Sequence, residues 1–252
     1  MHLTYDESTL VALLLCSTRV LAWTLLAPPL ATAGIPNTIK TVLSVAIGLA
    51  VVPVAQAHVP SPEIAPVAGA LLEQVVVGAS LGFLTRLLFT AVETAGGLLD
   101  LFGGFTAAAA YDPMTSATTS IFSKFYGLLC TTLIFATDVH LVIFQGFLRS
   151  FRAVPLDAGL SLSQLDQSIT SSVTQMFVSA LQIAGPLIVV LFLADIALGV
   201  LNRIAPQLNA FSMSFPIKIG LTLLLVGTSF MLMPQTIVDI ADHATSLVTA
   251  IN

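Results

Sequence analysis

The sequence predicts an all-α protein that lies in or against a membrane. Only 8% of its 252 residues are charged, 56% are hydrophobic, and the mean hydropathy is +1.00. A soluble domain of this length needs roughly a quarter of its residues charged to cover its surface, so most of this surface must face lipid or other protein. Apolar segments recur from end to end without a polar block between them, which predicts one domain over residues 1–252.

Six apolar runs are long enough to form helices that cross a bilayer, for which about 20 residues are needed. The first run is expected to be retained, because residues 1–7 carry acids and no Lys or Arg and so lack the basic flank of a cleavable signal peptide. Lys and Arg are too thinly spread to give an orientation by the positive-inside rule. The runs are 9–30, 38–57, 66–110, 120–148, 173–201 and 215–238.

Proline bends or ends several of these runs. Pro28-Pro29 turns the chain at the end of the first run, and Pro155 follows the fourth. Pro186 and Pro234 lie inside the fifth and sixth runs, where each removes a backbone donor that lipid cannot replace. Kinked or broken helices are therefore expected there, supported by neighbouring protein or by a water-filled cavity.

The third run is too long for a single crossing. It contains two glycine pairs, Gly96-Gly97 and Gly103-Gly104, so either two shorter helices or a helix followed by a buried turn is expected. In the same run, Gly78 and Gly82 have the GxxxG spacing that lets helix backbones approach closely, and this predicts packing only.

Charged residues interrupt the third run at a regular spacing. Arg86, Glu93 and Asp100 are seven residues apart, which places them on one face of a continuous helix. A charge at bilayer depth costs a few kcal/mol or more, so this face is expected to turn away from lipid. Two explanations remain open: pairing with neighbouring helices or headgroups, and a water-filled path. Arg19 and Glu73 are single charges inside apolar runs, and the same two explanations remain open for each.

The sequence lacks the motifs that mark several classes of function. No metalloprotease, serine-hydrolase or phosphate-loop motif is present, and the four histidines are scattered, so no enzyme, metal site or cofactor is expected. Cys16 and Cys130 lie in apolar runs without metal-ligand spacing, which is typical of small buried hydrophobes. The eight basic residues form no cluster, so nucleic acid is not expected as a partner.

The connection between the fifth and sixth runs carries the most distinctive motif. It reads Asn202-Arg203-Ile204-Ala205-Pro206-Gln207-Leu208-Asn209, and Pro216-Ile217-Lys218 follow. This segment closely resembles the signature of the FliR/SctT family, the export-gate subunits of flagellar and injectisome type III secretion. Three further stretches agree in order, so the resemblance covers nearly the whole chain. They are 29–53, 95–113 and 140–155.

The motif also has a physical interpretation. Arg203 and Lys218 flank a proline-stopped turn rich in side-chain amides, which suits a fixed connection that hydrogen-bonds its own carbonyls and neighbouring chains. The chain departs from the family elsewhere. Gly97 and Phe102 stand where the family usually has an acid and a glutamine, so polar contacts there are expected to differ. Asp138-Val139 replaces the usual Asn-Gly, which leaves the local turn open.

The resemblance implies a conduit for unfolded protein substrates in transit. The family member would be present as one copy with several copies of FliP and FliQ, alongside FlhB-like and FlhA-like export components and rod proteins, and in contact with membrane lipid. It would lie in the bacterial inner membrane at the flagellar basal body, partly raised to the periplasmic side. Its helices would form tilted hairpins of a membrane-associated complex rather than the regular six-crossing bundle that hydropathy suggests.

The resemblance further implies a plug that closes the pore, in the connection after the third run. Glycine permits unusual backbone angles, and Pro113 biases Asp112 away from helix, so the composition suits an irregular stopper. A plain surface turn remains an alternative. The plug residues implied are Gly103, Gly104, Phe105, Tyr111, Asp112, Pro113 and Met114.

Two other functions remain open. An injectisome SctT-type export subunit would share the 202–209 motif. An independent proton-coupled secondary transporter would use Arg86, Glu93 and Asp100 as a binding site at the middle of the membrane.

Overall fold

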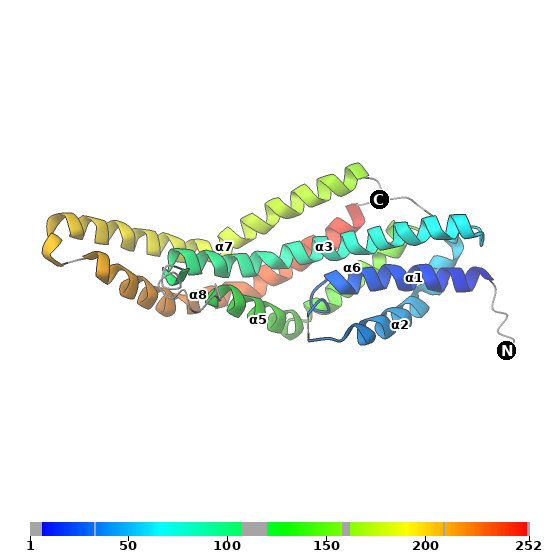
Figure 1. The fold of residues 1–252 in the computed structure, drawn as a ribbon, viewed down its shortest axis with the longest axis horizontal. Helices are drawn as coiled ribbons and strands as arrows, with labels where there is room; N and C mark the ends of the chain where they lie inside the picture. Colours follow the sequence, from blue (N-terminus) through cyan, green and yellow to red (C-terminus); the bar gives the residue numbers. More distant parts are fainter. Residues whose placement is uncertain (1–6, 33, 107–119, 158–161, 209, 251–252) are drawn as a thin grey trace. The chain divides into compact units, whose positions relative to one another are not determined.

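A computed structural model describes residues 7–32, 34–106, 120–157, 162–208 and 210–250. Within these ranges the chain forms helices joined by short turns, and no strand is present, which confirms the all-α prediction (Figure 1). The α-helices are α1 (Glu7–Leu26), α2 (Asn37–Ala55), α3 (Ile64–Phe102), α5 (Ile121–Ala136), α6 (Val139–Ala153), α7 (Leu162–Ile204) and α8 (Ala210–Ala250), with short 3-10 turns at η1 (Gln56–His58) and η2 (Pro206–Leu208).

Several helices are long and apolar enough to cross a membrane. Among the described residues there are five such helices, α1, α2, α3, α7 and α8, and a sixth if α5 and α6 are counted together. The helices α3, α7 and α8 contain 39, 43 and 41 residues, nearly twice what one crossing requires. If it crosses a bilayer, each of these helices therefore extends well beyond the hydrocarbon layer or packs against neighbouring protein.

The third run takes the second of the two forms expected for it, and the fourth run needs correction. The third run is one helix through Gly96-Gly97 and is followed by a buried turn at Gly103-Gly104. A Cβ at position 96 would collide with the carbonyl oxygen of Phe122, so this glycine admits a neighbouring backbone and does not end the helix. The fourth run divides into α5 and α6 at Asp138, whose φ of 57° is left-handed.

The helices continue through the internal prolines. Helix α7 runs without interruption through Pro186, and α8 runs through Pro216 and Pro234. Of the two expected forms, kinked or broken, the break is absent, because the turns on either side of each proline keep the helix together despite the missing donor. A kink at each proline stays a prediction.

The chain divides into two compact units. Unit 1 comprises Met1–Leu88, Asp138–Val173 and Asp239–Asn252, and unit 2 comprises Phe89–Thr137 and Thr174–Val238.

Unit 1 is held by close packing of α1 against α2 and α3. A Cβ at Gly78 would collide with the carbonyl oxygen of Arg19, and one at Gly82 would lie 3.0 Å from the carbonyl oxygen of Trp23. The GxxxG pair therefore lets the α3 backbone touch α1, which confirms the predicted packing role. On the other side of α1, a Cβ at Gly48 of α2 would lie 2.5 Å from Oγ of Ser17.

Unit 2 has an aromatic core between α5 and α8. Phe122 and Tyr126 are buried on α5, and the ring of Tyr126 lies 6.3 Å from that of Phe230 in α8. Phe125 contacts the same α8 ring at 5.6 Å. Aromatic pairs at these separations add to the stabilisation that burial gives.

The helix contact at Gly78 can be tested by substitution. Gly78→Ala should destabilise unit 1 by about 1–3 kcal/mol, because the added methyl forces α1 and α3 apart. The matched control is Gly69→Ala on the same helix, where a Cβ meets nothing within 4 Å and alanine favours helix by up to about 1 kcal/mol. Thermal unfolding in detergent, followed by fluorescence of the single tryptophan, Trp23, measures both. Equal midpoints for the two variants would contradict the close contact.

Candidate functional site

The predicted plug begins at a glycine turn in unit 2. Helix α3 ends at Phe102, and the amide of Gly103 donates to the carbonyl oxygen of Leu99 at 2.8 Å. A Cβ at position 103 would lie 2.7 Å from Oγ1 of Thr222 in α8. Gly104 has a φ of 84°, which L side chains rarely adopt. Both positions therefore require glycine, one for space and the other for backbone conformation.

The residues around this turn hold it in place. The Phe105 ring packs edge-on against Phe122 of α5, with centroids 5.1 Å apart, and a Cβ at Gly104 would meet the Phe215 ring of α8 at 3.2 Å. The remaining predicted plug residues, Tyr111, Asp112, Pro113 and Met114, lie outside the described residues.

The three regularly spaced charges have different surroundings. Helix α3 is continuous across them, as predicted, so they follow one another along one helix face at intervals of about 10 Å, too far apart to pair directly. Arg86 and Glu93 are exposed, whereas Asp100 is completely buried. Side chains in such different environments do not form a single binding site.

The carboxylate of Asp100 caps helix α5. Its Oδ1 accepts a hydrogen bond from the amide of Phe122 and its Oδ2 accepts one from Ser123, both at 3.1 Å. These amides belong to the first turn of α5, where helix geometry leaves the donors without intrahelical partners. Ser120, which precedes the helix, makes no side-chain capping bond. The charge of Asp100 is therefore stabilised by the positive end of α5.

Glu93 lies beside α5 in a shallow polar hollow. A Cβ at Gly127 would lie 3.0 Å from Oε1 of Glu93, so the glutamate packs directly against the α5 backbone. Lys124 lines the same hollow and is exposed, but it makes no ion pair with Glu93. The hollow thus presents an acid and a base on a mainly apolar surface. Its lining residues are Glu93, Ser123, Lys124, Gly127, Leu128 and Thr131.

The motif between α7 and α8 forms an exposed turn. The amide of Ala205 donates to the carbonyl oxygen of Leu201 at 2.8 Å, and the 3-10 turn η2 begins at Pro206. Nζ of Lys218 pairs with Oδ2 of Asp195 at 3.0 Å, which ties α8 to α7. Asn209 lies outside the described residues. The exposed motif residues are Asn202, Arg203, Pro206, Gln207 and Pro216.

A buried arginine cluster in unit 1 goes beyond the sequence prediction. Arg19 of α1 is completely buried, and its Nε donates to Oε1 of Gln74 in α3 at 2.6 Å. Its Nη1 donates to the carbonyl oxygen of Ser150 near the end of α6 at 3.2 Å, and its guanidinium lies 4.5 Å from the Phe151 ring centre. Gln74 in turn donates through Nε2 to the carbonyl oxygen of Leu156 at 3.3 Å. One charge thus joins α1, α3 and α6.

No carboxylate pairs with Arg19 among the described residues. Its charge is instead offset by the negative end of α6, by the glutamine oxygen and by the face of an aromatic ring. The sequence analysis identified Arg19 as a charge inside an apolar run. It could not predict Gln74 as the partner, because Gln74 is 55 residues away and no sequence spacing relates the two. Gly78, one turn beyond Gln74, and Gly82 were the local indications of close packing.

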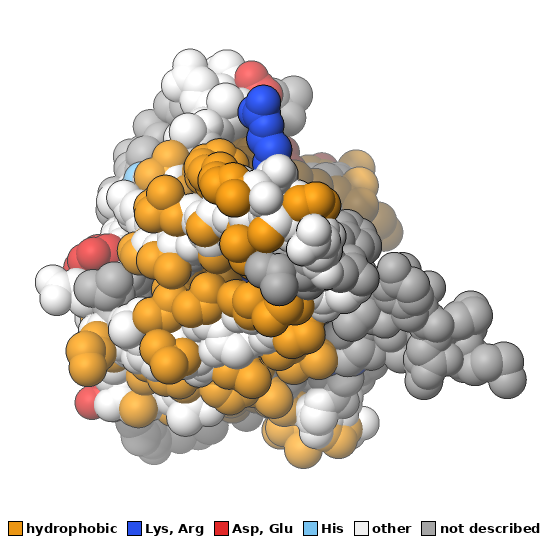
Figure 2. All heavy atoms as spheres, turned by 90° about the vertical axis from the view of Figure 1, so that its left-hand side faces the viewer, with side chains coloured by type: hydrophobic (Ala, Val, Ile, Leu, Met, Phe, Trp, Pro, Cys, Tyr) orange, Lys and Arg blue, Asp and Glu red, His pale blue; other side chains and the backbone are white. Residues whose placement is uncertain are grey.

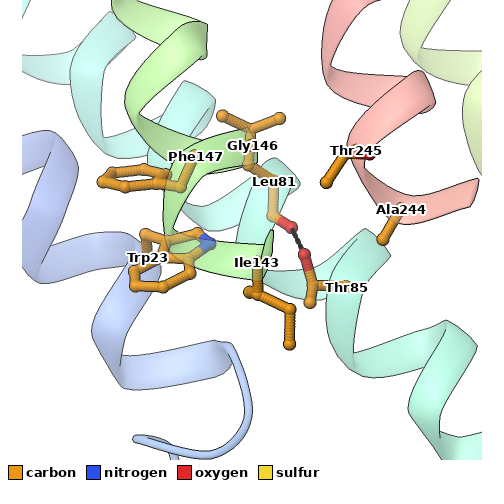
Figure 3. A pocket seen from close by; sticks show the side chains of 8 residues that line it. All are labelled: Trp23, Leu81, Thr85, Ile143, Gly146, Phe147, Ala244 and Thr245. Carbon is orange, nitrogen blue, oxygen red and sulfur yellow. Dashed lines mark hydrogen bonds between the residues drawn. The ribbon is translucent and has the colours of Figure 1, made fainter. Parts of the chain in front are cut away.

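The cavity beside the tryptophan of unit 1 is too small for a small-molecule ligand. A cavity of about 10 Å³ lies between α1, α3, α6 and α8, beside the stacked rings of Trp23 and Phe147 (Figure 3). That space holds about one water molecule. Within the described ranges, no three His, Cys, Asp or Glu side chains are grouped to hold a metal ion. The cavity is lined by Trp23, Leu81, Thr85, Ile143, Gly146, Phe147, Ala244 and Thr245.

Comparison with known families accounts for this combination of long apolar helices and an exposed polar turn. The model of the family described as bacterial export proteins, family 1, matches residues 10–244. The chain belongs to bacterial export protein family 1.

Members of this family serve flagella and related secretion systems. The flagellar biosynthetic protein FliR of Pectobacterium carotovorum subsp. carotovorum is 31% identical over 218 residues, covering 86% of this chain and 83% of that protein. FliR of Escherichia coli (strain K12) is 31% identical over 223 residues, covering 86% and 82%. The secretion system apparatus protein SsaT of Salmonella typhimurium is 31% identical over 163 residues, covering 64% and 63%.

The match to bacterial export protein family 1 includes the main features described above. The Arg19 cluster, the Asp100 cap, the glycine turn and the 202–209 motif all lie inside residues 10–244. The chain is therefore a membrane-associated protein of the type III export family, and the predicted resemblance to FliR and SctT is confirmed.

The Arg19 cluster predicts a specific sensitivity at Gln74. Gln74→Leu should destabilise unit 1 by about 2–3 kcal/mol, because it leaves Nε of a buried guanidinium without an acceptor. The matched control is Glu73→Leu, which places the same side chain at the exposed neighbouring position. Trp23 lies one turn from Arg19, so its fluorescence during thermal unfolding reports both. If Glu73→Leu proved as harmful as Gln74→Leu, the cluster would not be what stabilises this packing.

Proposed function

We propose that this chain is a structural and gating subunit of the flagellar type III protein export gate, present as one copy with FliP and FliQ around a secretion pore. The observation that carries the proposal is the match to FliR proteins over 86% of the chain. The matches to FliR proteins cover between 61% and 86% of it and those to the injectisome proteins SpaR and SsaT cover 62% and 64%, so the matches of widest coverage are to FliR.

The surface of α7 and α8 supports a role inside an assembly. In the most apolar stretch of α7 only 22% is buried within the chain, and in that of α8 only 11%. Figure 2 views the end where these helices join and shows hydrophobic side chains gathered over the middle of that face. A continuous apolar surface of this kind requires protein or lipid to cover it. Large exposed side chains on these helices include Val189, Phe192, Leu193, Ile196, Val200, Ile204, Leu223 and Leu224.

The exposed turn between α7 and α8 is the proposed contact with neighbouring subunits. Asn202 and Arg203 are exposed, so their donors and acceptors are available to another chain. Pro206 and Gln207 extend this polar surface, and Asn209 continues the same motif in sequence. The pair Lys218–Asp195 holds α8 to α7 beneath it.

The connection from Gly103 to the start of α5 is the proposed plug. The glycine turn fixes where the connection leaves α3, and Asp100 fixes where it enters α5. The sealing role itself rests on the resemblance to the family.

The remaining partners are proposed on the same basis. They are FlhB-like and FlhA-like export components, rod proteins and unfolded substrates in transit, at an inner-membrane site in the basal body that is partly raised toward the periplasm. In this function the protein is a conduit and catalyses no reaction.

Co-expression tests the proposal. The chain, expressed with FliP and FliQ from the same organism, should purify as a complex of fixed stoichiometry containing one copy of it. A chain that purifies alone, with FliP and FliQ present but unassociated, would contradict the proposal.

An injectisome SctT-type role is the second candidate, supported by the matches to SpaR and SsaT at 30% and 31% identity. The genes beside this one decide between the two systems. The structure does not favour an independent proton-coupled transporter, because Asp100 is bonded to α5 while Arg86 and Glu93 are exposed. Proton-coupled uptake by the chain alone in liposomes would restore that alternative.

Shortening the proposed plug should open the pore. Removal of residues from 103–118 should leave the complex assembled but make liposomes that contain it permeable to ions and small solutes, because the stopper is lost. Stoichiometry and ion flux are measured on the same preparation. An assembled complex with unchanged permeability would remove the plug assignment.

Arg203→Ala should impair assembly. Loss of an interfacial arginine leaves its partners on the other chain unpaired, so the yield of complex should fall about tenfold or more. Arg152→Ala, at an exposed position near the end of α6, is the control. Normal assembly together with lost export would place Arg203 in transport instead.

A further inference from the structure

We propose that the hollow between α3 and α5 is a docking site for a helix of a neighbouring export subunit, one that brings a basic side chain to Glu93 and an acidic side chain to Lys124. The inference rests on the proposed function, since it assumes that other subunits surround this chain. It goes further by naming a contact surface on helices other than α7 and α8, and the chemistry of the partner that fits it.

The two charges of the hollow have no partner within the described residues. The side chains of Glu93 and Lys124 take part in no hydrogen bond or ion pair there, although they line one hollow of about 420 Å³. Both are exposed, so another chain can reach them. A partner that carried only one sign of charge would leave the other charge of the hollow covered and unpaired, which is costly. The partner that fits therefore carries both signs.

The surface around the hollow suits protein better than water or lipid. Leu128 lines the hollow and is 72% exposed, and Phe135, seven residues further along the same face of α5, is 53% exposed. Water disfavours these apolar side chains, whereas hydrocarbon disfavours the two charges beside them. A protein surface that carries apolar side chains and opposite charges satisfies both.

Open space beside α3 lets a second helix approach the hollow. A Cβ at Gly97, one turn after Glu93 on the same helix face, would meet nothing within 4 Å. Because glycine presents no side chain, another backbone can come close to α3 there. In α5, Gly127 leaves room for the Glu93 side chain, whose Oε1 would lie 3.0 Å from a Cβ at that position. The carboxylate is thereby held against α5, in the same hollow as Lys124.

The first test removes the acid from the complex assembled with FliP and FliQ. Glu93→Leu replaces a charge by an apolar side chain, so it would improve a surface that faces lipid. In a docking site it leaves the partner's basic side chain without a counter-charge, and the yield of complex should fall about tenfold or more. The matched control is Glu73→Leu, the same substitution at another exposed position of α3, which should keep the wild-type yield.

A charge swap separates a docking site from a pair within the chain. When Glu93→Lys is combined with Lys124→Glu, the two charges can still serve each other, but each meets a like charge on the proposed partner. The yield of complex should therefore fall at least as far as with Glu93→Leu. A photo-crosslinking amino acid at Leu128, in the complex with both charges intact, should link to another subunit, and this measurement does not depend on how the charge variants fold.

Wild-type yield with the charge swap, equal loss with Glu73→Leu, or links from Leu128 to lipid alone would overturn the proposal. If the unchanged chain forms no complex with FliP and FliQ, the proposed function itself fails. If that complex forms and the charge swap leaves it intact, only the docking site fails.

Discussion

The structure depends on one constraint: a charged group that leaves water in this chain needs polar partners within the protein. The two fully buried charges described above meet it in the same way. Arg19 donates to a backbone carbonyl near the end of α6, and Asp100 accepts from backbone amides at the start of α5. Each uses the end of a helix as its counter-charge, so each fixes that helix end against another helix. Very few charges thereby specify the packing of long apolar helices.

The sequence predicted the parts of this fold that are local. Apolar runs and their lengths gave the helices, and the spacing of Gly78 and Gly82 gave a close helix contact, because both signals lie within a few turns of chain. The seven-residue spacing correctly placed Arg86, Glu93 and Asp100 along one continuous helix. It did not reveal that only Asp100 is buried, since that depends on where α5 packs. Gln74 could not be predicted as the partner of Arg19 for the same reason.

The glycine pairs also show that local sequence cannot predict which neighbour a residue meets. The sequence treats Gly96-Gly97 and Gly103-Gly104 alike, as two places where a long helix can end. In the structure, Gly96 admits the backbone of α5 inside a continuous helix, whereas Gly103-Gly104 ends it. The difference arises from the neighbour at each site, which no local pattern contains. The family motif at 202–209 could be read early because its residues are contiguous, although its contacts lie in other chains if the proposed function holds.

In the proposed function, other export components cover the exposed apolar side chains of α7 and α8. The most direct measurement places a photo-crosslinking amino acid at Phe192, which is 56% exposed, in the complex assembled in native membranes. The account predicts that it links to another protein subunit in high yield. Links to lipid alone would contradict it.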